Sequence, residues 1–395
     1  MMYLILLLFF LFSAGMVFYS YVLFPWILAL CSNLKRYDKL VWENHENLPA
    51  VSVLISAFNE EKVLEAKLES IMESDYPEEK LEVIIGSDGS DDGTALIAER
   101  FAKKYPSLRF IDFKQRRGKP SVINDLVNEA KHPFIVLTDA NVMFSPDALR
   151  HLMKNFRDPK TGLVGANILN ESMKNEGISF QEMSYIAREN RIKYHEGKCW
   201  GSMMGPFGGC YAMRKDLFLP VPANFLVDDF YISMSVLRKK YKCINELEAI
   251  CYEDLPDDIY QEYKRKVRIS AGNFQNLVVF SSMLLRPFSA AGFCFISHKV
   301  IRWMTPFLII INTASLIGLS FYSKYFILLL IAELMLVFSP VFDKVFSRVG
   351  LNFRLLRFIS YFSFMNLALL KGFFRYAAGV RSGVWSRTER TNANA

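Results

Sequence analysis

The feature of this 395-residue sequence that most limits its fold is an uncharged apolar run at its start. Residues 1–34 carry no charged side chain, and residues 1–31 are apolar over more than the ~20 residues that cross a bilayer. A cleaved signal peptide would need a charged start and a site of small residues, so we expect an uncleaved transmembrane anchor over residues 1–34. Cations follow at once (Lys35, Arg36, Lys39), and this charge predicts that the next domain faces the cytoplasm.

A second apolar region lies near the other end of the sequence. Residues 304–342 hold only two charged side chains, so we expect a transmembrane hairpin there. Residues 286–303 mix aromatic and basic side chains and predict an amphipathic helix in the membrane interface. Within residues 343–395, the uncharged stretch 358–370 is short for a span. An interfacial helix, a re-entrant helix and a third span all stay open there, ahead of a basic tail.

Between these regions, residues 35–285 have the pattern of an α/β domain. Apolar, β-branched runs predict four strands, at 50–58, 81–86, 108–113 and 134–138. Helical patterns follow the first three, near residues 60–71, 94–104 and 119–130. One helix between successive strands predicts a doubly wound, mostly parallel sheet. Ligands of such sheets bind at the carboxyl ends of the strands.

A polar cluster follows each of these four strands. The clusters are Asn59-Glu60, Asp88, Arg116-Arg117-Gly118-Lys119 and Asp139-Ala140-Asn141. Carboxylates beside cations suit a metal-bound diphosphate, because a carboxylate shares the ion and a cation neutralises the leaving group. Asp139 and Asn141 can face one ion, and Lys119 at a helix start suits a phosphate. Asp88 suits a base or a ribose.

Several other functions lack their signatures. After the first strand we find no dinucleotide-binding glycine motif, no P-loop and no glycine- and arginine-rich loop of a nucleotidylyltransferase. Residues 88–99 are similar to a calcium-binding loop, but a strand rather than a helix enters it. The six cysteines have no zinc spacing. A net charge of +7, with basic residues flanking apolar segments, favours a lipid bilayer over a nucleic acid.

Taken in order, these motifs resemble the donor-binding half of family 2 glycosyltransferases, and among them the membrane synthases of cellulose, chitin, hyaluronan and poly-N-acetylglucosamine. The similar segments are residues 51–60, 87–94, 117–119, 138–140 and 208–214. Val227-Asp228-Asp229 stands where the family carries T-E-D, and residues 265–269 where it carries Q-x-x-R-W. Trp385-x-x-Thr388-x-Arg390 is similar to the loop that covers the bound nucleotide.

The resemblance implies a nucleotide-sugar-binding, GT-A-like domain that uses Mg²⁺ or Mn²⁺ and inverts the anomeric centre of a sugar, with a UDP-sugar as the expected donor. It implies Asp229 as the general base. The implied donor contacts are Ala57, Asn59, Glu60, Asp88, Lys119, Asp139, Arg265 and Arg268. The implied acceptor-side residues are Gly208, Gly209 and Asp228, the metal ligands Asp139 and Asn141, and the gating residues Trp385, Thr388 and Arg390. From the residues alone, an acidic N-cap at 228–229 and a membrane-facing basic helix at 265–268 stay open.

Two departures from the family pattern shape the expected reaction. Asn141 replaces the second aspartate of D-x-D, which removes one charge but keeps a carbonyl ligand. Arg265 and Ile269 replace the Gln and Trp of Q-x-x-R-W, and isoleucine cannot stack on an acceptor sugar. We therefore expect limited transfer to a lipid-linked or oligosaccharide acceptor in cell-surface glycan synthesis at the inner (plasma) membrane, where a homo-oligomer or a partner membrane subunit could complete a channel. A processive polysaccharide synthase and an inactive membrane scaffold are the alternatives.

Overall fold

The computed structural model describes residues 1–35, 40–42, 44, 47–170, 178–253, 259–351 and 353–384. The chain divides into two units. The helical unit comprises Met1–Ile27, Asp258–Pro287 and Phe295–Gly379. The sheet unit comprises Leu28–Asp257, Phe288–Cys294 and Val380–Ala395.

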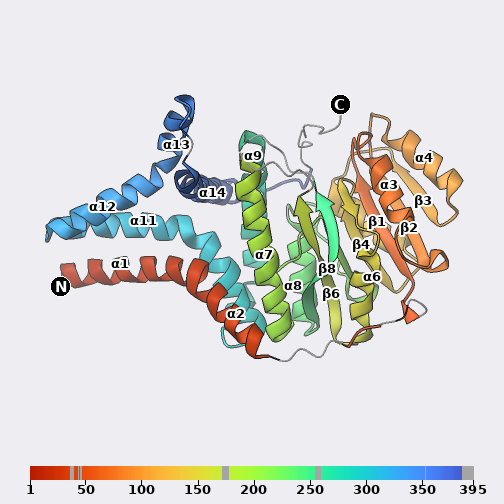
Figure 1. Cartoon of the computed structure of the whole chain (residues 1–395), viewed down its shortest axis with the longest axis horizontal. Coiled ribbons are helices and arrows are strands. Elements are labelled where there is room, and N and C mark those ends of the chain that lie inside the picture. Colours follow the sequence, from red (N-terminus) through yellow and green to blue (C-terminus); the bar gives the residue numbers. More distant parts are fainter. Residues whose placement is uncertain are drawn as a thin grey trace. The chain divides into compact units, whose positions relative to one another are not determined.

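The sheet unit is built on one eight-stranded sheet with the order β3-β2-β1-β4-β7-β6-β8-β5 (Figure 1). The strands are β1 (Val51–Ala57), β2 (Leu81–Asp88), β3 (Leu108–Phe113), β4 (Phe134–Asp139), β5 (Val142–Phe144), β6 (Thr161–Asn170), β7 (Cys210–Arg214) and β8 (Lys242–Glu253). The first four strands pair in parallel with one another, which confirms the predicted parallel sheet in this half. Beyond β4 the sheet is mixed, because β7 runs antiparallel to both β4 and β6.

Almost every residue of the three inner parallel strands β1, β2 and β4 is buried, because helices cover the sheet. Every residue of β2 is buried, as expected for a strand that is covered on both faces. The connecting helices are α3 (Leu64–Met72), α4 (Thr94–Lys104) and α5 (Lys119–Glu129). The rest of the sheet, from β7 to β5, is called the antiparallel half because β7 reverses the strand direction, although β6 and β8 pair in parallel within it. This half adds α6 (Ala148–Met153), α7 (Ile178–Trp200) and α8 (Asp228–Arg238). The predicted α/β fold is thereby confirmed, with strands and helices alternating where the hydrophobic pattern placed them.

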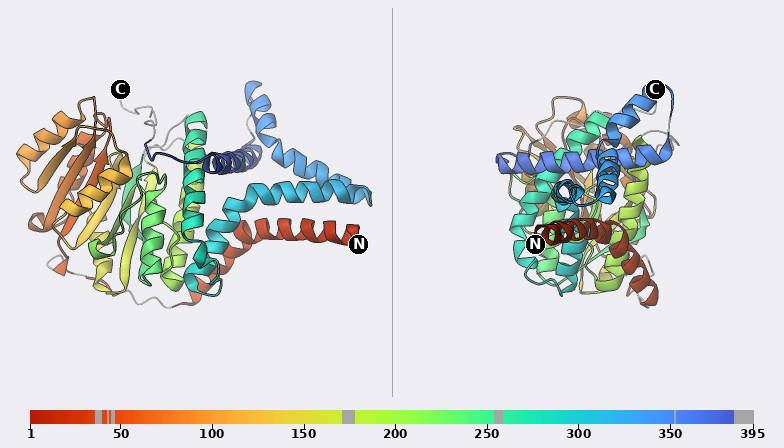
Figure 2. Two further views of the ribbon diagram at one scale, coloured as in Figure 1. Left: turned by 180° about the vertical axis from the view of Figure 1, so that it is seen from behind. Right: turned by 90° about the vertical axis from the view of Figure 1, so that its left-hand side faces the viewer.

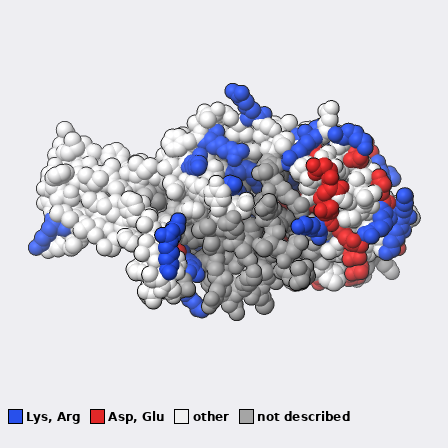
Figure 3. All heavy atoms as spheres, turned by 90° about the horizontal axis from the view of Figure 1, so that it is seen from above, with Lys and Arg blue, Asp and Glu red and all other residues white. Residues whose placement is uncertain are grey.

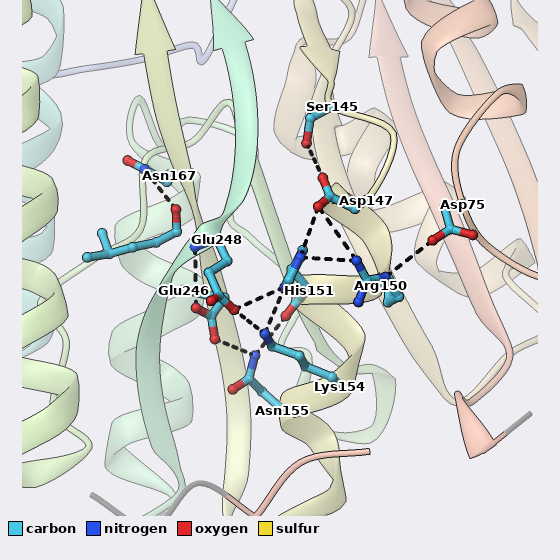
Figure 4. A network of polar contacts seen from close by, with 11 residues as sticks. Asp75, Ser145, Asp147, Arg150, His151, Lys154, Asn155, Asn167, Glu246 and Glu248 are labelled. Atoms are coloured by element: carbon cyan, nitrogen blue, oxygen red, sulfur yellow. Dashed lines mark hydrogen bonds and ion pairs between the residues drawn. The ribbon is translucent and has the colours of Figure 1, made fainter. Parts of the chain in front are cut away.

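A network of polar side chains fastens α6 to β8 (Figure 4). His151 Nε2 lies 3.0 Å from Asp147 Oδ2, and Lys154 Nζ lies 2.7 Å from the other ring nitrogen. Asn155 Nδ2 donates to the buried Glu246 Oε2 at 3.1 Å. Because these groups are hydrogen-bonded to one another, the network stabilises the packing of a short helix on a long strand.

The helical unit contains helices at both ends of the chain. They are α1 (Met2–Phe18), α9 (Ile259–Val279), α11 (Ile301–Ser320), α12 (Lys324–Val337), α13 (Ser339–Arg348) and α14 (Arg354–Ala377). Helices α1 and α11 run side by side in Figure 1 and in the left view of Figure 2. Asn312 of α11 joins them, because its Nδ2 donates to Phe10 O at 3.0 Å and to Ser13 Oγ at 2.8 Å. Side-chain amides commonly join membrane helices in this way.

Two helical stretches of the described chain are long and apolar enough to cross a membrane, Met2–Leu34 and Ala290–Ser320. The first stretch runs from α1 through a π-helical segment (Tyr19–Leu23) into α2 (Phe24–Leu34). The pair formed by α12 and α13 would count as a third span if taken together, although it bends by 57°. On the face drawn in Figure 3, the left-hand part of the picture carries almost no Lys, Arg, Asp or Glu side chains.

The boundaries of these helices differ from those expected. Residues 290–320 form one stretch, from α10 (Ala290–Cys294) through a π-helical segment (Phe295–Val300) into α11, so no helix ends at residue 303. One basic side chain of the expected interfacial helix, Arg302, is buried, and its Nη2 donates to Ser20 O at 3.3 Å. The second arm of the hairpin ends at Val337, and α13 begins at Ser339 with Pro340 in its first turn. The final helix, α14, extends over 24 residues.

Candidate active site

Asp88 is the last residue of β2, and its carboxylate organises the loop that leads into α5. Arg117 N donates to Asp88 Oδ1 at 2.7 Å, and Gly118 N donates to Asp88 Oδ2 at 2.8 Å. Gly118 has a φ of 89°, a conformation that favours glycine. Because Asp88 is only 3% exposed, direct contact with a ligand would require an exchange of these hydrogen bonds. Asp88 therefore places Lys119, the first residue of α5.

The residues that follow β1 fasten the loop that follows β2. Asn59 lies just beyond the buried Ala57, and its Nδ2 donates to Asp91 Oδ1 at 2.6 Å. Asp91 N donates back to Asn59 Oδ1 at 3.0 Å. Glu60 N donates to Thr94 Oγ1 at 2.8 Å, at the start of α4. These contacts hold two neighbouring loops together at the carboxyl edge of the sheet.

Lys119 joins residues from both halves of the sheet. Its Nζ lies 2.5 Å from Asp139 Oδ1, at the end of β4, and 3.9 Å from Asp228 Oδ2, at the start of α8. Burial opposes the charge of this lysine, yet the neighbouring carboxylates outweigh burial and raise the pKa of Lys119 above its usual range. The structure therefore brings a cation and carboxylates from β4 and α8 to one point.

Asp228 and Asp229 occupy the first turn of α8. The N-cap of this helix is Val227, so neither aspartate is the acidic N-cap that the sequence left open. Asp229 Oδ1 accepts from Phe230 N at 2.7 Å. Burial, with the adjacent Asp228 carboxylate adding to it, raises the pKa of Asp229 to about 6. A carboxylate in this range is suited to accept a proton at neutral pH.

The glycine pair before β7 lets the two halves approach closely. A Cβ at Gly208 would lie 2.9 Å from Asp229 Oδ2, so a side chain there would displace this carboxylate. Asp139 N donates to Gly209 O at 3.0 Å. A small hollow with room for about one water molecule lies here. It is lined by Gly208 and by the polar residues Ser56, Lys119, Thr138, Tyr211 and Asp228, with apolar residues beside them.

Two buried polar atoms among the described residues that line this hollow have no hydrogen-bond partner. They are the hydroxyl oxygen of Tyr211 and Oδ2 of Asp228. Burial raises the pKa of Tyr211 well above its ordinary value, with the nearby carboxylates adding to the shift. Buried polar groups are normally hydrogen-bonded, so two unpaired polar atoms in this hollow fit a site that receives a polar ligand.

The residues proposed as metal ligands are a carboxylate and an amide. Asn141 Nδ2 donates to Glu253 Oε1 at 3.5 Å. Glu253 was not singled out from the sequence, although an acidic residue at the end of a strand could have indicated it. The antiparallel pairing of Val142 with Glu253 brings this side chain beside Asn141. Within the described chain, no three Asp, Glu, His or Cys side chains gather as a complete metal site. The oxygen ligands present fit Mg²⁺ or Mn²⁺, provided that a bound diphosphate supplies further oxygens.

Other expected site residues belong to the helical unit or fall outside the described residues. Arg265 and Arg268 belong to α9 of the helical unit, where Arg265 Nε lies 3.1 Å from Glu262 Oε2. The gating residues Trp385, Thr388 and Arg390 lie outside the described residues. The described residues 380–384 just before them belong to the sheet unit. Gly383 N donates to Ala223 O at 3.1 Å, and Val384 Cγ2 lies 3.3 Å from where a Cβ at Gly118 would be.

Comparisons with known proteins show what the sheet unit is similar to. Residues 52–219 match the family model Glycosyl transferase family 2. The chain is similar to the poly-beta-1,6-N-acetyl-D-glucosamine synthase of Staphylococcus epidermidis, with 25% identity over 244 residues, 60% of this chain and 58% of the relative. The synthase of Staphylococcus aureus (strain COL) is 25% identical over 252 residues, 62% of this chain and 60% of the relative. The matched part is therefore less than two thirds of either synthase.

A solved structure shows the same fold. The mannosyltransferase PcManGT from Pyrobaculum calidifontis, in complex with GDP-Man and Mn²⁺, matches with a TM-score of 0.72 and 21% sequence identity. The match covers 95% of this chain and 99% of that chain. The expected GT-A-like fold with added apolar helices is thereby confirmed.

Proposed function

Because residues 52–219 form a family 2 glycosyltransferase domain, we propose that this protein moves a sugar from a nucleotide sugar to a lipid-linked or oligosaccharide acceptor. The observation that carries this proposal is the meeting of Lys119, Asp139 and Asp228-Asp229 at the carboxyl edge of the sheet. The donor is a UDP-sugar by the family resemblance, whereas the matching mannosyltransferase was solved with GDP-Man. The nucleotide therefore has to be tested.

The parallel half of the sheet would hold the donor. Lys119 and the amino end of α5 favour the negative charge of a diphosphate. Asp139 and Asn141 would hold Mg²⁺ or Mn²⁺. Asp88, which accepts hydrogen bonds from the loop at 117–118, would contact the nucleotide. When bound, the ion supplies positive charge to the departing diphosphate. When the donor binds, the Lys119 ammonium group would exchange its ion pair with Asp139 for one with the diphosphate.

The antiparallel half would activate the acceptor. Asp229 accepts the proton of the acceptor hydroxyl as its oxygen bonds to C1 of the sugar and the bond from C1 to the diphosphate breaks. A single displacement of this kind inverts the anomeric centre. Gly208 and Gly209 leave room for the acceptor beside Asp229, and Asp228 keeps the pKa of its neighbour high. Arg265, Arg268 and the residues Trp385, Thr388 and Arg390 would contact or cover the bound donor.

The apolar helices would keep the enzyme at the inner (plasma) membrane. Met2–Leu34 and Ala290–Ser320 have the length and composition of spans. Lys35 follows the first helix directly, which favours a cytoplasmic sheet unit that meets soluble nucleotide sugars. A homo-oligomer or a partner membrane subunit would complete any channel for a longer product.

A second candidate function is processive polymerisation of a polysaccharide. It is favoured by the similarity to two poly-beta-1,6-N-acetyl-D-glucosamine synthases. It is disfavoured by Ile269, which stands where the processive relatives carry a tryptophan. Product length on a gel separates the two functions, because limited transfer yields short products and polymerisation yields a ladder or a high-mass band.

The test of the proposed function is nucleotide release. Purified full-length protein in detergent, supplied with Mn²⁺ and a lipid extract as acceptor, is incubated with panels of UDP-sugars and GDP-sugars. We expect release of UDP or GDP from one class of donor, and loss of this release on chelation of the metal. Absence of release from every donor, with protein whose fold is verified by circular dichroism, would leave the inactive scaffold as the better account.

A further inference from the structure

Lys67 is a fully buried lysine on α3 that the proposed mechanism does not use. The buried face of α3 consists of Leu64, Lys67, Leu68 and Ile71, so the lysine occupies a position where the helical pattern calls for an apolar residue. Burial lowers the pKa of Lys67 to about 8, because it disfavours the charged form. A buried charge of this kind persists only where polar partners compensate it.

The partners of Lys67 lie on both sides of the turn at 139–141. Lys67 Nζ donates to Thr138 Oγ1 at 3.0 Å and to the carbonyl oxygen of Val142. The same ammonium group lies 3.6 Å from the centre of the Phe144 ring. Thr138 precedes Asp139 and Val142 follows Asn141, so one cation fixes both ends of the turn that carries the proposed metal ligands.

Further hydrogen bonds extend this attachment. Thr138 Oγ1 donates to Gly209 O at 2.9 Å and so connects the turn to the glycine pair beside Asp229. One helical turn after Lys67, Ser70 Oγ accepts from Phe144 N at 3.2 Å. Helix α3 therefore anchors the backbone from Thr138 to Phe144 at several points, and Lys67 supplies those closest to the proposed metal ligands.

We propose that Lys67 is a positioning residue that holds the turn at 139–141 from its core side, so that Asp139 and Asn141 face one divalent ion. This inference rests on the proposed function, since it concerns the same site. A lysine that only filled the core would affect stability when replaced. A lysine that positions the turn affects the affinity for the ion, whatever its effect on stability.

The experiment separates affinity for the ion from stability. Binding of Mn²⁺ to the full-length protein in detergent is measured by electron paramagnetic resonance, with UDP and with GDP, and the melting temperature is measured without metal. Lys67→Met removes the donor and keeps most of the length of the unbranched side chain. Leu68→Ala is the matched control, because Leu68 is equally buried on the same helix but cannot hydrogen-bond to the turn.

We expect Lys67→Met to raise the Kd for Mn²⁺ by about 10- to 100-fold, as for other residues that orient metal ligands. Leu68→Ala should lower the melting temperature and leave this Kd within about twofold of wild type. Thr138→Val removes an acceptor of Lys67 without altering α3, and we expect a smaller rise in the Kd. This variant also decides the question if Lys67→Met does not fold.

Wild-type affinity for Mn²⁺ in the Thr138→Val variant and in any folded Lys67→Met protein would overturn the role of Lys67 alone. If wild-type protein bound no Mn²⁺ with either nucleotide, the proposed metal site would fall and the positioning role with it. The two failures are thus distinguishable, because only the second appears in the unmodified protein.

Discussion

In the parallel half of the sheet, Lys119 and Asp139 form an ion pair with 2.5 Å between Nζ and Oδ1. In the antiparallel half, two carboxylates of like charge, Asp228 and Asp229, follow each other in the first turn of α8. A balanced ion pair can exchange partners with a charged ligand and its counter-ion, whereas two adjacent carboxylates of like charge favour proton uptake. The difference indicates a division of labour, in which the first half binds the donor and the second half moves the proton.

The strongest test of this division replaces the proposed base. Asp229→Asn keeps the shape of the side chain but cannot accept a proton, so we expect kcat to fall by about 10²- to 10⁴-fold. The Kd for the donor should stay within about twofold of wild type, because the ligands on β4 and α5 are unchanged. Turnover at the wild-type rate would remove Asp229 from the role of base.

The opposite effect is expected in the parallel half. Asp139→Asn removes the carboxylate that would share the ion with the diphosphate. We therefore expect the Kd for the nucleotide in the presence of Mn²⁺ to rise more than about tenfold. Isothermal titration of the nucleotide with and without Mn²⁺ measures this change. Asp147→Asn is the control, because Asp147 belongs to the network around His151 and should leave the nucleotide affinity unchanged.

A subtler change acts where the two halves touch. Gly208→Ala places a Cβ 2.9 Å from the original position of Asp229 Oδ2, so the carboxylate must move. We expect kcat to fall on the order of tenfold, because a small misplacement of a reacting group is costly, while donor affinity is retained. Steady-state kinetics at saturating donor measure the loss. Equal losses of kcat and of donor affinity would argue that Gly208 belongs to the donor side.

The smallest expected effect concerns pH. Asp229 is active only when deprotonated, so with a pKa of about 6 the rate should rise as pH increases through this value and level off above it. Asp228→Asn removes the neighbouring negative charge, so the pKa of Asp229 falls and the rising limb moves to lower pH, by up to about one unit. A limb that stayed in place would show that Asp228 does not influence Asp229.

The sequence predicted the parallel half best, because its signals are local. Continuous β-branched runs and single connecting helices placed β1 to β4, and the carboxyl-end rule then placed Lys119 and Asp139 on one edge. Lys67 escaped prediction because its acceptor Thr138 lies 71 positions further along the chain. Glu253 and Asn141 are 112 positions apart, and only the register of β8 joins them. The contact of Arg302 with Ser20, 282 positions earlier, could not be predicted for the same reason.

The most direct test of the proposed division is a paired measurement on Asp139→Asn and Asp229→Asn. Donor Kd and kcat are determined for both variants in one preparation, with the donor that the wild-type protein uses. The account predicts that Asp139→Asn weakens donor binding, whereas Asp229→Asn binds the donor normally and turns over at least about 10²-fold more slowly. Equal effects of the two substitutions on donor binding would contradict it.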